Sequence, residues 1–336
     1  MIMKALIEER RAGLVENIHE GIICGVNHQL ETVYTVGNVE QYVYYRSAAK
    51  PIQAIPAFMI DIKEKYQLTD EEATLFTASQ RGETYHINAL ESLLKKLKVQ
   101  EKNLYCAPSL ALNSEPRNEM IRNRQEKRKL YHNCAGKHLG FLAVCRELDY
   151  PIEGYWKIDH PLQQKIVSIL ADLAEISTEK IKVGVDGCGV PVFALPLKNM
   201  ATPYLKLACP DLIEDMEVRN AVIQMTKLMN ENPDIVASER FVCSVLLRDS
   251  NIVAKGGAQG VYCFGLKKER MAFALKVLSG SEDVWPNILA SILEQIAYEN
   301  KATIAALKEL RTSAIKNDAG TKVGEIKTVF SLSNVH

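Results

Sequence analysis

The sequence lacks an excess of charge of either sign. Its 336 residues include 41 lysines and arginines and 41 aspartates and glutamates, so the formal net charge is zero. A neutral chain has no net field that would draw it to nucleic acid or to an anionic membrane. The most basic stretch, IRNRQEKRKLYHN, is interrupted by Glu126 and reads as a solvated loop or helix face. We therefore expect no nucleic-acid partner.

A long apolar run is also missing. No segment reaches the roughly 18 apolar residues that cross a bilayer, and the N-terminal MIMKALIEERRAGLVE has no continuous apolar signal region. We expect no membrane partner and a cytoplasmic location. Internal repeats and low-complexity linkers are absent too. The chain, 47% apolar and 24% charged, is therefore expected to be one globular domain, 1–336, with a candidate subdomain seam near residues 230–238.

The cysteines do not have the spacing of a disulfide framework. Eight cysteines in 336 residues are too sparse for the pattern of small secreted domains. In a reducing compartment cysteines are core residues, metal ligands or active-site groups. Six of them lie in surroundings that predict core positions: Cys24, Cys106, Cys145, Cys209, Cys243 and Cys263.

The segments that are present alternate between β-rich and helical patterns. Residues 14–45 read as short strands with a turn at Gly37–Asn38, and residues 252–266 and 271–279 read as one strand each. Residues 50–68 and 284–310 each read as one helix. Thr69 and Glu72 have the spacing of a capping box. Strands at the two ends of a helical middle predict an α+β fold with a largely antiparallel sheet.

The stretch YYRSAAKPIQAIPAF places Ser47 and Lys50 three positions apart. Side chains at this spacing share one helix face. A neutral lysine amine can take the proton of a serine hydroxyl if burial or a second cation lowers the lysine pKa. Pro51 disfavours a fully helical Lys50, a conflict that eases if the helix begins here. The other interpretation is a serine N-cap beside a solvent lysine, and the motif alone favours it.

A second lysine occurs in AKGGAQGVYCFGL, where Lys255 precedes two glycines. Small residues there let a substrate backbone lie beside a strand edge. An S-x-x-K helix start with a later K-[ST]-G strand is the arrangement of serine β-lactamases and penicillin-binding proteins, although Gly256 replaces the Ser or Thr here. A lysine that only adds charge to a strand edge is the alternative.

The loop TASQRGETYH contains Ser79, Arg81 and His86 beside a glycine. Polar groups at such a junction are typical of a functional site. A capped loop, and for His86 a buried helix histidine, are the alternatives.

Two further segments, YHNCAGKHLGF and GVDGCGVPVF, contain candidate metal ligands. Cys134, Lys137 and His138 fall within one helical turn, and Cys188 lies in a glycine-bracketed turn two residues after Asp186. Two thiols from distant turns could hold zinc, with histidine or solvent completing the shell. The spacing is not that of a structural C-x-x-C site, so it favours an incomplete, weaker site. Two buried cysteines without metal are the alternative.

Together, RSAAKPIQAIP, ASQRGETYH, HNCAGKHLGFLAVC, HPLQQ, GVDGCGVPVFALPL and AKGGAQGV closely resemble the bacterial and fungal asparaginase family typified by the Rhizobium inducible enzyme. The resemblance runs from about residue 10 to the end. It implies hydrolysis of a small molecule, L-asparagine, to L-aspartate and ammonia. It also implies a fold like that of the serine β-lactamases and glutaminases, and a homodimer.

The resemblance also implies roles for individual residues. The two Ser–Lys pairs of the family fall on Ser47 with Lys50 and on Ser79 with Lys255. A metal, usually zinc, lies beside the substrate in this family and is expected to modulate activity rather than to build the fold. The matching ligand positions are Cys134, Lys137 and Cys188.

Recognition of a free amino acid requires a fixed cation and a fixed anion. Arg240 and Asp186 are our candidates, with Arg46 and Arg81 as alternates for the cation. A turn role for Asp186 is equally open.

The sequence departs from the family pattern at two places. Gln80 stands where the family usually has histidine, and ASERF at residues 237–241 stands where it usually has AGTxR. Two alternative functions therefore stay open. One is a β-lactamase-like serine amidase or peptidase acting on another amide. The other is a zinc-dependent binding protein without turnover.

Overall fold

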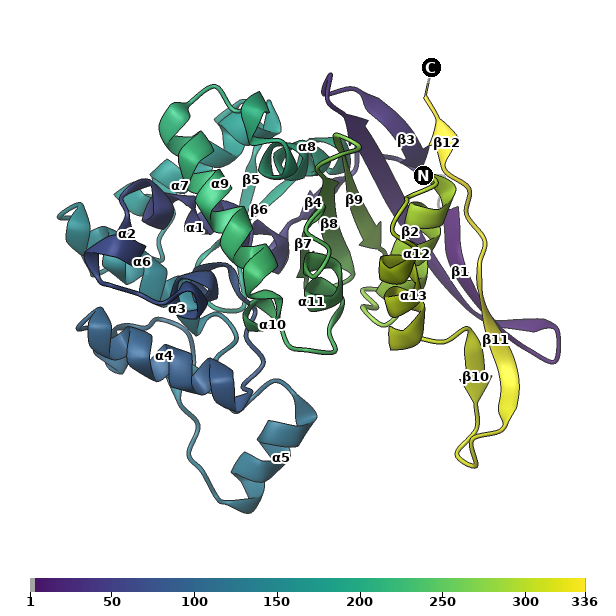
Figure 1. The fold of residues 1–336 in the computed structure, drawn as a ribbon, viewed down its shortest axis with the longest axis horizontal. Coiled ribbons are helices and arrows are strands. Elements are labelled where there is room, and N and C mark those ends of the chain that lie inside the picture. Colours follow the sequence, from purple (N-terminus) through teal and green to yellow (C-terminus); the bar gives the residue numbers. More distant parts are fainter. Residues whose placement is uncertain (1–3, 336) are drawn as a thin grey trace. The chain divides into compact units, whose positions relative to one another are not determined.

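The computed structural model describes residues 4–335, and the chain forms two compact units. Unit 1 contains the chain up to Ala48, Leu195–Ala208, and the chain from Arg240 onward; unit 2 contains Ala49–Ala194 and Cys209–Glu239. Figure 1 shows the path of the chain through both. Among the described residues, no helix is both long and apolar enough to span a membrane. The expected single asparaginase domain, with a seam near 230–238, stays a prediction.

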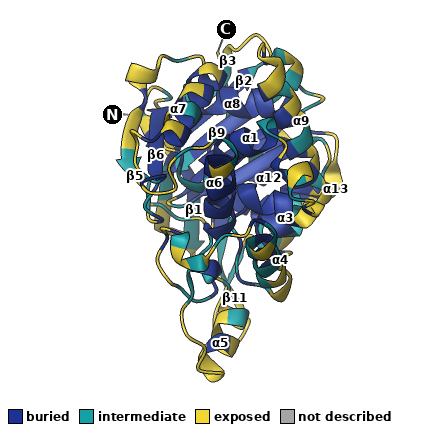
Figure 2. Ribbon diagram, turned by 90° about the vertical axis from the view of Figure 1, so that its left-hand side faces the viewer, coloured by how far each residue is buried: buried dark blue, intermediate teal, exposed yellow. Residues whose placement is uncertain are grey.

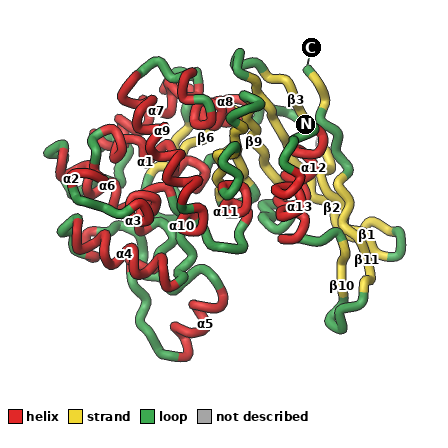
Figure 3. The backbone as a smooth tube through the Cα atoms, viewed as in Figure 1, coloured by secondary structure: helices red, strands yellow, loops and turns green. Residues whose placement is uncertain are grey.

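Unit 1 is built on a nine-stranded antiparallel sheet within the described residues. Its strand order is β10-β11-β1-β2-β9-β8-β7, with β3 also pairing with β2 and β12 pairing with β3 (yellow in Figure 3). The expected α+β class with a largely antiparallel sheet is confirmed. The strands are β1 (Lys4–Arg11), β2 (Leu14–Asn27), β3 (Thr32–Val36), β7 (Ile252–Gly257), β8 (Val261–Leu266), β9 (Met271–Val277), β10 (Ala314–Lys316), β11 (Lys322–Thr328) and β12 (Ser333–Asn334).

The central strands of this sheet are covered by α8 (Leu197–Ala208), which packs on β2, β8 and β9. A Cβ added at Gly265 would lie 2.2 Å from the carbonyl oxygen of Tyr204, so helix and strand are in backbone contact there. Every residue of β7 and of β8 is buried. The neighbouring strand β9 and helix α8 are mostly dark blue, the colour of buried residues, in Figure 2. The remaining elements of unit 1 are β4 (Tyr42–Tyr44), α11 (Val242–Leu247), α12 (Trp285–Gln295) and α13 (Lys301–Leu310).

Two predictions about unit 1 were wrong. Residues 252–266 form the hairpin β7–β8 rather than one strand, because Gln259 and Gly260 adopt φ of 66° and 75°. Positive φ at both central residues is the type I′ turn that joins adjacent strands. Residues 284–310 form two helices rather than one, since Ala297 at φ 55° ends the first.

Unit 2 is a helical body around α1 (Lys50–Met59), which packs against α6 (Ala135–Glu147), α7 (Pro161–Ala174) and α9 (Met216–Glu231). Pro51 lies in the first turn of α1, as expected, and Lys50 to Phe58 are all buried. The helix expected over 50–68 is interrupted, because Asp61 adopts a left-handed φ of 54° before α2. The other elements are α2 (Ile62–Lys65), α3 (Asp70–Thr74), α4 (Thr84–Lys96), α5 (Ser114–Arg122), α10 (Pro233–Val236), β5 (Lys182–Val185) and the first four residues of β6 (Pro191–Pro196).

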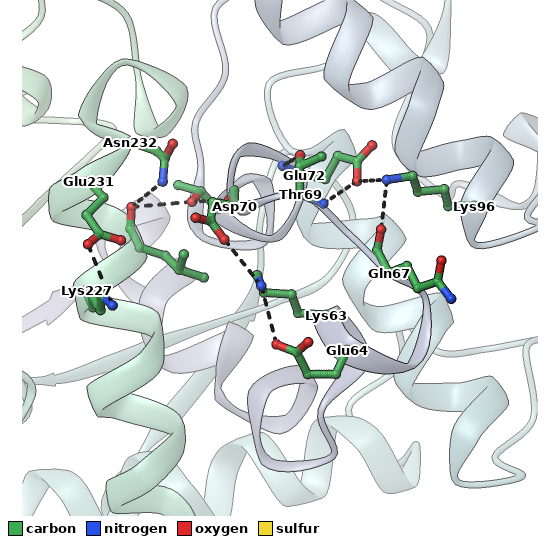
Figure 4. A network of polar contacts seen from close by, with 12 residues as sticks. Lys63, Glu64, Gln67, Thr69, Asp70, Glu72, Lys96, Lys227, Glu231 and Asn232 are labelled. Carbon is green, nitrogen blue, oxygen red and sulfur yellow. Dashed lines mark hydrogen bonds and ion pairs between the residues drawn. The ribbon is translucent and has the colours of Figure 1, made fainter.

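The expected capping box begins α3 and is confirmed (Figure 4). The Glu72 N–H donates to Thr69 Oγ1 at 3.2 Å, and the Thr69 N–H donates to Glu72 Oε2 at 2.7 Å. Glu72 is only 2% exposed and also accepts from Lys96 Nζ at 2.8 Å. Lys96 in turn donates to the Gln67 carbonyl at 2.9 Å. The start of α3 is thereby tied to the end of α4.

Candidate functional site

The central contact of the candidate site in unit 2 joins Lys50 to Ser79. Lys50 is the first residue of α1 and is 1% exposed. Its Nζ donates to the carbonyl oxygens of Ala78 at 2.7 Å and Asn133 at 3.1 Å, and lies 3.0 Å from Ser79 Oγ. Of these three partners, only the serine hydroxyl can also donate a proton. A neutral Lys50 could therefore keep both carbonyl bonds and accept from Ser79.

Burial is the main influence on Lys50. It lowers the pKa of the ammonium group, Cys134 opposes this shift, and Lys137 adds to it. Lys50 therefore loses its proton to become a neutral amine more easily than a solvent-exposed lysine does. A buried lysine with a lowered pKa next to a serine hydroxyl has the form of a base and its nucleophile.

Backbone packing places Ser79 in this position. Ser79 follows the short 3-10 turn Leu75–Thr77, and its N–H donates to the Val236 carbonyl at 2.8 Å. A Cβ added at Gly136 in α6 would lie 2.3 Å from the Leu75 carbonyl. Only glycine permits so close an approach of the helix to this turn. The segment with Ser79 is therefore held against the start of α6.

Gln80 ties the loop after Ser79 to the segment before α6. It is 1% exposed, and its Nε2 donates to the carbonyls of Tyr131 and His132, each at 2.9 Å. Its Oε1 accepts from the Gly82 N–H at 2.7 Å. All of these bonds suit a side-chain amide, which has two N–H donors and an acceptor oxygen. The departure from the family pattern at position 80 thus has a complete set of partners.

The expected metal residues lie together in unit 2. Cys134 precedes α6, Lys137 lies in its first turn, and Cys188 lies in the turn between β5 and β6. Lys137 Nζ lies 3.3 Å from Cys188 Sγ. The three residues are 4%, 2% and 3% exposed. Gly189 permits this turn because it adopts φ of +88°, and an added Cβ would lie 2.3 Å from Tyr105.

The two thiols share a hydrogen bond and titrate as a pair. The bond to Cys188 is the main reason why the pKa of Cys134 lies well below its usual range, and the same bond and burial raise the pKa of Cys188. Such a pair loses its protons in two steps that belong to both thiols rather than to either one. Burial alone would lower the pKa of Lys137, but the sulfurs of Cys188 and Cys134 outweigh it and raise that pKa.

These residues fit a zinc ion. Within residues 4–335, no group of three His, Cys, Asp or Glu side chains is placed to hold a metal, so a lysine would have to complete such a set. Nitrogen and sulfur ligands of a tetrahedral zinc lie about 3.6 Å apart, close to the 3.3 Å between Lys137 Nζ and Cys188 Sγ. A thiolate is already favoured in the pair. Lys137 would have to lose its proton to coordinate.

Unit 1 contains Ser47 and Lys255. Ser47 lies half-buried in the 3-10 turn Arg46–Ala49, and Lys255 lies in β7, where its Nζ donates to the Gly256 carbonyl at 2.8 Å. A Cβ added at Gly257 would lie 2.4 Å from the Tyr45 carbonyl and 3.0 Å from the Ala48 N. The end of β7 therefore lies directly against the segment with Ser47. The predicted pairs Ser47–Lys50 and Ser79–Lys255 stay predictions.

The four candidates for substrate recognition differ in their surroundings. Arg46 adopts a left-handed φ of 49° and Arg240 is exposed. Arg81 Nε donates to Asn113 Oδ1, so this guanidinium already holds a neighbouring loop. Asp186 Oδ1 accepts from the Gly187 N–H at 2.8 Å, which supports the turn role that the sequence left open. A role in substrate binding stays a prediction for all four.

Sequence reasoning missed the backbone acceptors of the site. Ala78 and Asn133 contribute carbonyl oxygens, which no side-chain motif reveals. The sequence analysis named Gln80 only as a departure from the family pattern and did not predict its hydrogen bonds. The sequence feature that could have indicated them is a side-chain amide directly after the candidate serine Ser79.

Comparison with known proteins gives the chain its family. The sequence model of the L-asparaginase II family matches residues 7–328 of the chain. No curated protein matches the chain. A β-lactamase from Mycobacterium bovis is similar in structure, with 14% identity and a TM-score of 0.41, over 82% of this chain and 94% of that one. A Bacillus glutaminase has 12% identity and a TM-score of 0.39, over 83% and 92%.

The narrower assignment to the Rhizobium inducible type stays a prediction. Because the family match covers nearly the whole sequence, the chain belongs to the L-asparaginase II family.

Proposed function

We propose that this protein hydrolyses L-asparagine to L-aspartate and ammonia. Membership of the L-asparaginase II family points to an amidohydrolase. The observation that supports serine chemistry is the 3.0 Å contact between Lys50 Nζ and Ser79 Oγ, with a lysine that is 1% exposed. A homodimer and a cytoplasmic location remain part of the proposal.

In the proposed reaction, neutral Lys50 takes the proton of Ser79 Oγ as the oxygen attacks the side-chain amide carbon of asparagine. The C–N bond then breaks, and Lys50 returns the proton to the leaving nitrogen, so ammonia departs and an ester forms on the serine. Lys50 next takes a proton from water as the water oxygen attacks the ester. Aspartate leaves, and the serine oxygen regains a proton from Lys50.

The pairs Ser47–Lys50 and Ser79–Lys255 that the resemblance implies remain part of the proposal, beside the Lys50–Ser79 contact. Ser47 and Lys255 come from neighbouring segments of unit 1, since the end of β7 lies against residues 45–48. We propose that Ser47 and Lys255 assist the reaction that Lys50 and Ser79 begin. Zinc, when bound, would be held by Cys134, Lys137 and Cys188 and would supply a positive charge beside the site.

Selection of a free amino acid is proposed to depend on Arg240 and Asp186, with Arg46 as the alternate cation. An arginine holds a carboxylate with two parallel hydrogen bonds. Arg81 is the weakest of the candidates, because Asn113 already accepts from its guanidinium.

An ammonia-release assay tests the proposal. The panel contains L-asparagine, L-glutamine, N-acetyl-asparagine and asparagine α-amide, and the S79A and S47A variants are assayed beside the wild type. We expect release from L-asparagine, none from the two blocked compounds, and a large loss in the variants. Equal turnover of free and blocked substrates would favour a serine amidase or peptidase. Zinc binding with no release from any amide would favour a binding protein.

A further inference from the structure

An arm of unit 2, residues 109–128, projects from the body of this unit and contains α5 (Figure 1). Two backbone hydrogen bonds close its base: the Ser109 N–H donates to the Arg128 carbonyl at 3.0 Å, and the Arg128 N–H donates to the Ser109 carbonyl at 3.1 Å. Arg128 also donates to Glu91 Oε1 of α4 at 2.6 Å. Of the nine residues of α5, only Met120 is buried, so apolar packing does little to fix the position of this helix.

The chain just before α5 lies against the loop that follows Ser79. The Asn113 N–H donates to the Arg81 carbonyl at 3.0 Å. Gly82 adopts φ of +85°, and a Cβ added there would lie 2.3 Å from Ala111 Cβ. Only glycine permits this backbone conformation together with so close an approach. The start of α5 is thereby fixed to the loop that contains Ser79.

The side chain of Asn113 adds two further bonds to this loop. Asn113 is the N-cap residue of α5, a position where asparagine is favoured because its side-chain oxygen can accept from an N–H of the first helical turn. The Asn113 side chain makes no such bond. Its Oδ1 instead accepts from Arg81 Nε, and its Nδ2 donates to Glu83 Oε1. The amide therefore bonds to the loop rather than to its own helix.

This neutral amide lies between two opposite charges. Arg81 and Glu83 are two positions apart, and each contacts a different end of the Asn113 amide. Without the amide, the guanidinium and the carboxylate can pair with each other, since an arginine–carboxylate contact is strong and often bidentate. We expect such a pairing to displace the loop, and with it Ser79 from its 3.0 Å contact with Lys50 Nζ.

We propose that Asn113 is a positioning residue for Ser79, and that the arm of residues 109–128 therefore helps to build the candidate site. The inference rests on the proposed function in one respect, namely that Ser79 takes part in amide hydrolysis. Gln80 holds the same loop through separate bonds to the segment before α6. Small displacements of a reacting group lower the rate by about 10- to 100-fold, and an effect of this size is expected when the Asn113 amide is removed.

Ammonia release from L-asparagine is measured for N113A, N113D and the double variant N113D/E83Q, and circular dichroism verifies each fold. N113A should lower kcat by about 10- to 100-fold, with a smaller change in KM. N113D retains an acceptor for Arg81 but places a second carboxylate beside Glu83, so it should lose at least as much.

The double variant exchanges the two groups. In N113D/E83Q an amide at position 83 can donate to a carboxylate at position 113, which still accepts from Arg81. This variant should recover most of the kcat that N113D loses. Two substitutions that only weakened the packing would add their losses instead.

N300A is the matched control. Asn300 is the N-cap residue of α13 in unit 1, and its Oδ1 accepts from the Ala302 N–H at 3.2 Å. This variant removes the same type of side chain from the same helix position, and with it a true cap. It should unfold at a lower urea concentration than the wild type and retain wild-type kcat.

Amide hydrogen exchange gives a measurement that does not depend on asparagine. In N113A, residues 79–83 and 111–113 should exchange faster than in the wild type. If the wild type releases no ammonia from L-asparagine, the proposed function fails, and the exchange rates alone decide whether Asn113 holds the loop. If N113A does not fold, the comparison of N113D with N113D/E83Q gives the test.

Four results would overturn the inference. They are wild-type kcat in a folded N113A, equal kcat in N113D and N113D/E83Q, unchanged exchange of residues 79–83 in N113A, and a loss of kcat in N300A as large as that in N113A. The last result would show that reduced stability accounts for both losses.

Discussion

Gln80 Nε2 lies 2.9 Å from the carbonyl oxygen of His132, and this bond joins the loop after Ser79 to the segment that leads into α6. The same segment contains the Asn133 carbonyl, which accepts from Lys50. The side-chain amide of Gln80 therefore links the loop that contains Ser79 to the segment that contains the Asn133 carbonyl, an acceptor of Lys50. We therefore expect the geometry of the Lys50–Ser79 pair to depend on this amide.

The Q80E variant tests this dependence. A carboxylate cannot donate to the Tyr131 and His132 carbonyls and would repel them, so we expect kcat to fall by about 10- to 100-fold, since small displacements of a catalytic group have costs of this size. The change in KM should be smaller. Q80H, which retains one donor, should lose less. Kinetics that match the wild type in Q80E would show that Gln80 does not position the serine.

The pH dependence of activity follows from the lowered pKa of Lys50. The protonated amine cannot act as a base, so kcat/KM should rise with pH as Lys50 loses its proton and should approach zero at acid pH. Burial lowers this pKa below the ordinary lysine value of 10.5, so the rise should be complete at lower pH than for an exposed lysine. The measurement is a pH profile of kcat/KM for ammonia release.

A control variant separates Lys50 from a nearby histidine. His132 is half-buried, and this partial burial lowers its pKa. Its Nδ1 accepts from the Cys134 N–H at 3.1 Å. H132N keeps an acceptor at this place and removes the titrating ring. The rise with pH should persist in H132N. Its disappearance would assign the rise to His132 and contradict the role of Lys50.

Removal of zinc should leave the fold intact. The helices around α1 pack directly against one another, so we expect that unit 2 can assemble without a metal at Cys134 and Cys188. We expect about one zinc per chain, lost on mild chelation with an unchanged circular dichroism spectrum. C134S should bind little zinc. Unfolding on chelation would make the metal structural, and a protein that never binds zinc would refute the site.

His86 should make stability depend on pH. Burial lowers its pKa to about 4, and its Nε2 lies 3.1 Å from the Asp234 carbonyl. The unfolded chain binds the proton first, near the ordinary value of 6.5. The contribution of neutral His86 is therefore present above pH 6.5 and lost as the pH falls toward 4, with a size on the order of 3 kcal/mol.

Urea unfolding of the wild type and H86Q at several pH values between 7 and 4 measures this contribution. Glutamine retains an N–H donor but does not titrate. The stability advantage of the wild type over H86Q should shrink as the pH falls. An advantage that stays constant across this range would show that His86 does not titrate in the folded protein in the expected way.

Local patterns of the sequence predicted a large part of the fold. The wrong predictions concern segments whose secondary structure depends on tertiary contacts. The capping box at Thr69 and the buried positions of the six cysteines assigned to the core were predicted correctly. The hairpin turn at Gln259–Gly260 was missed because β7 and β8 are buried throughout, which makes the apolar run look continuous.

The site shows the same division. The motifs identified Lys50 and Ser79 separately, from a helix start and a polar loop. Their contact spans 29 positions along the chain and depends on the packing of α1 and α6 beside the turn Leu75–Thr77. Spacing in the sequence reports neighbours within one helix, so it associated Lys50 with Ser47 and could not show the bond to Ser79.

The most direct test of the account is the rate of ammonia release from L-asparagine by the wild type and K50M. Methionine has a similar length and no proton acceptor of lysine strength, so it fits the buried position of Lys50 and removes the base. Circular dichroism verifies the fold of both proteins. The account predicts release by the wild type and a loss in kcat of about 100- to 10,000-fold in K50M. A folded K50M with wild-type kcat, or a wild type that releases no ammonia from L-asparagine, would contradict it.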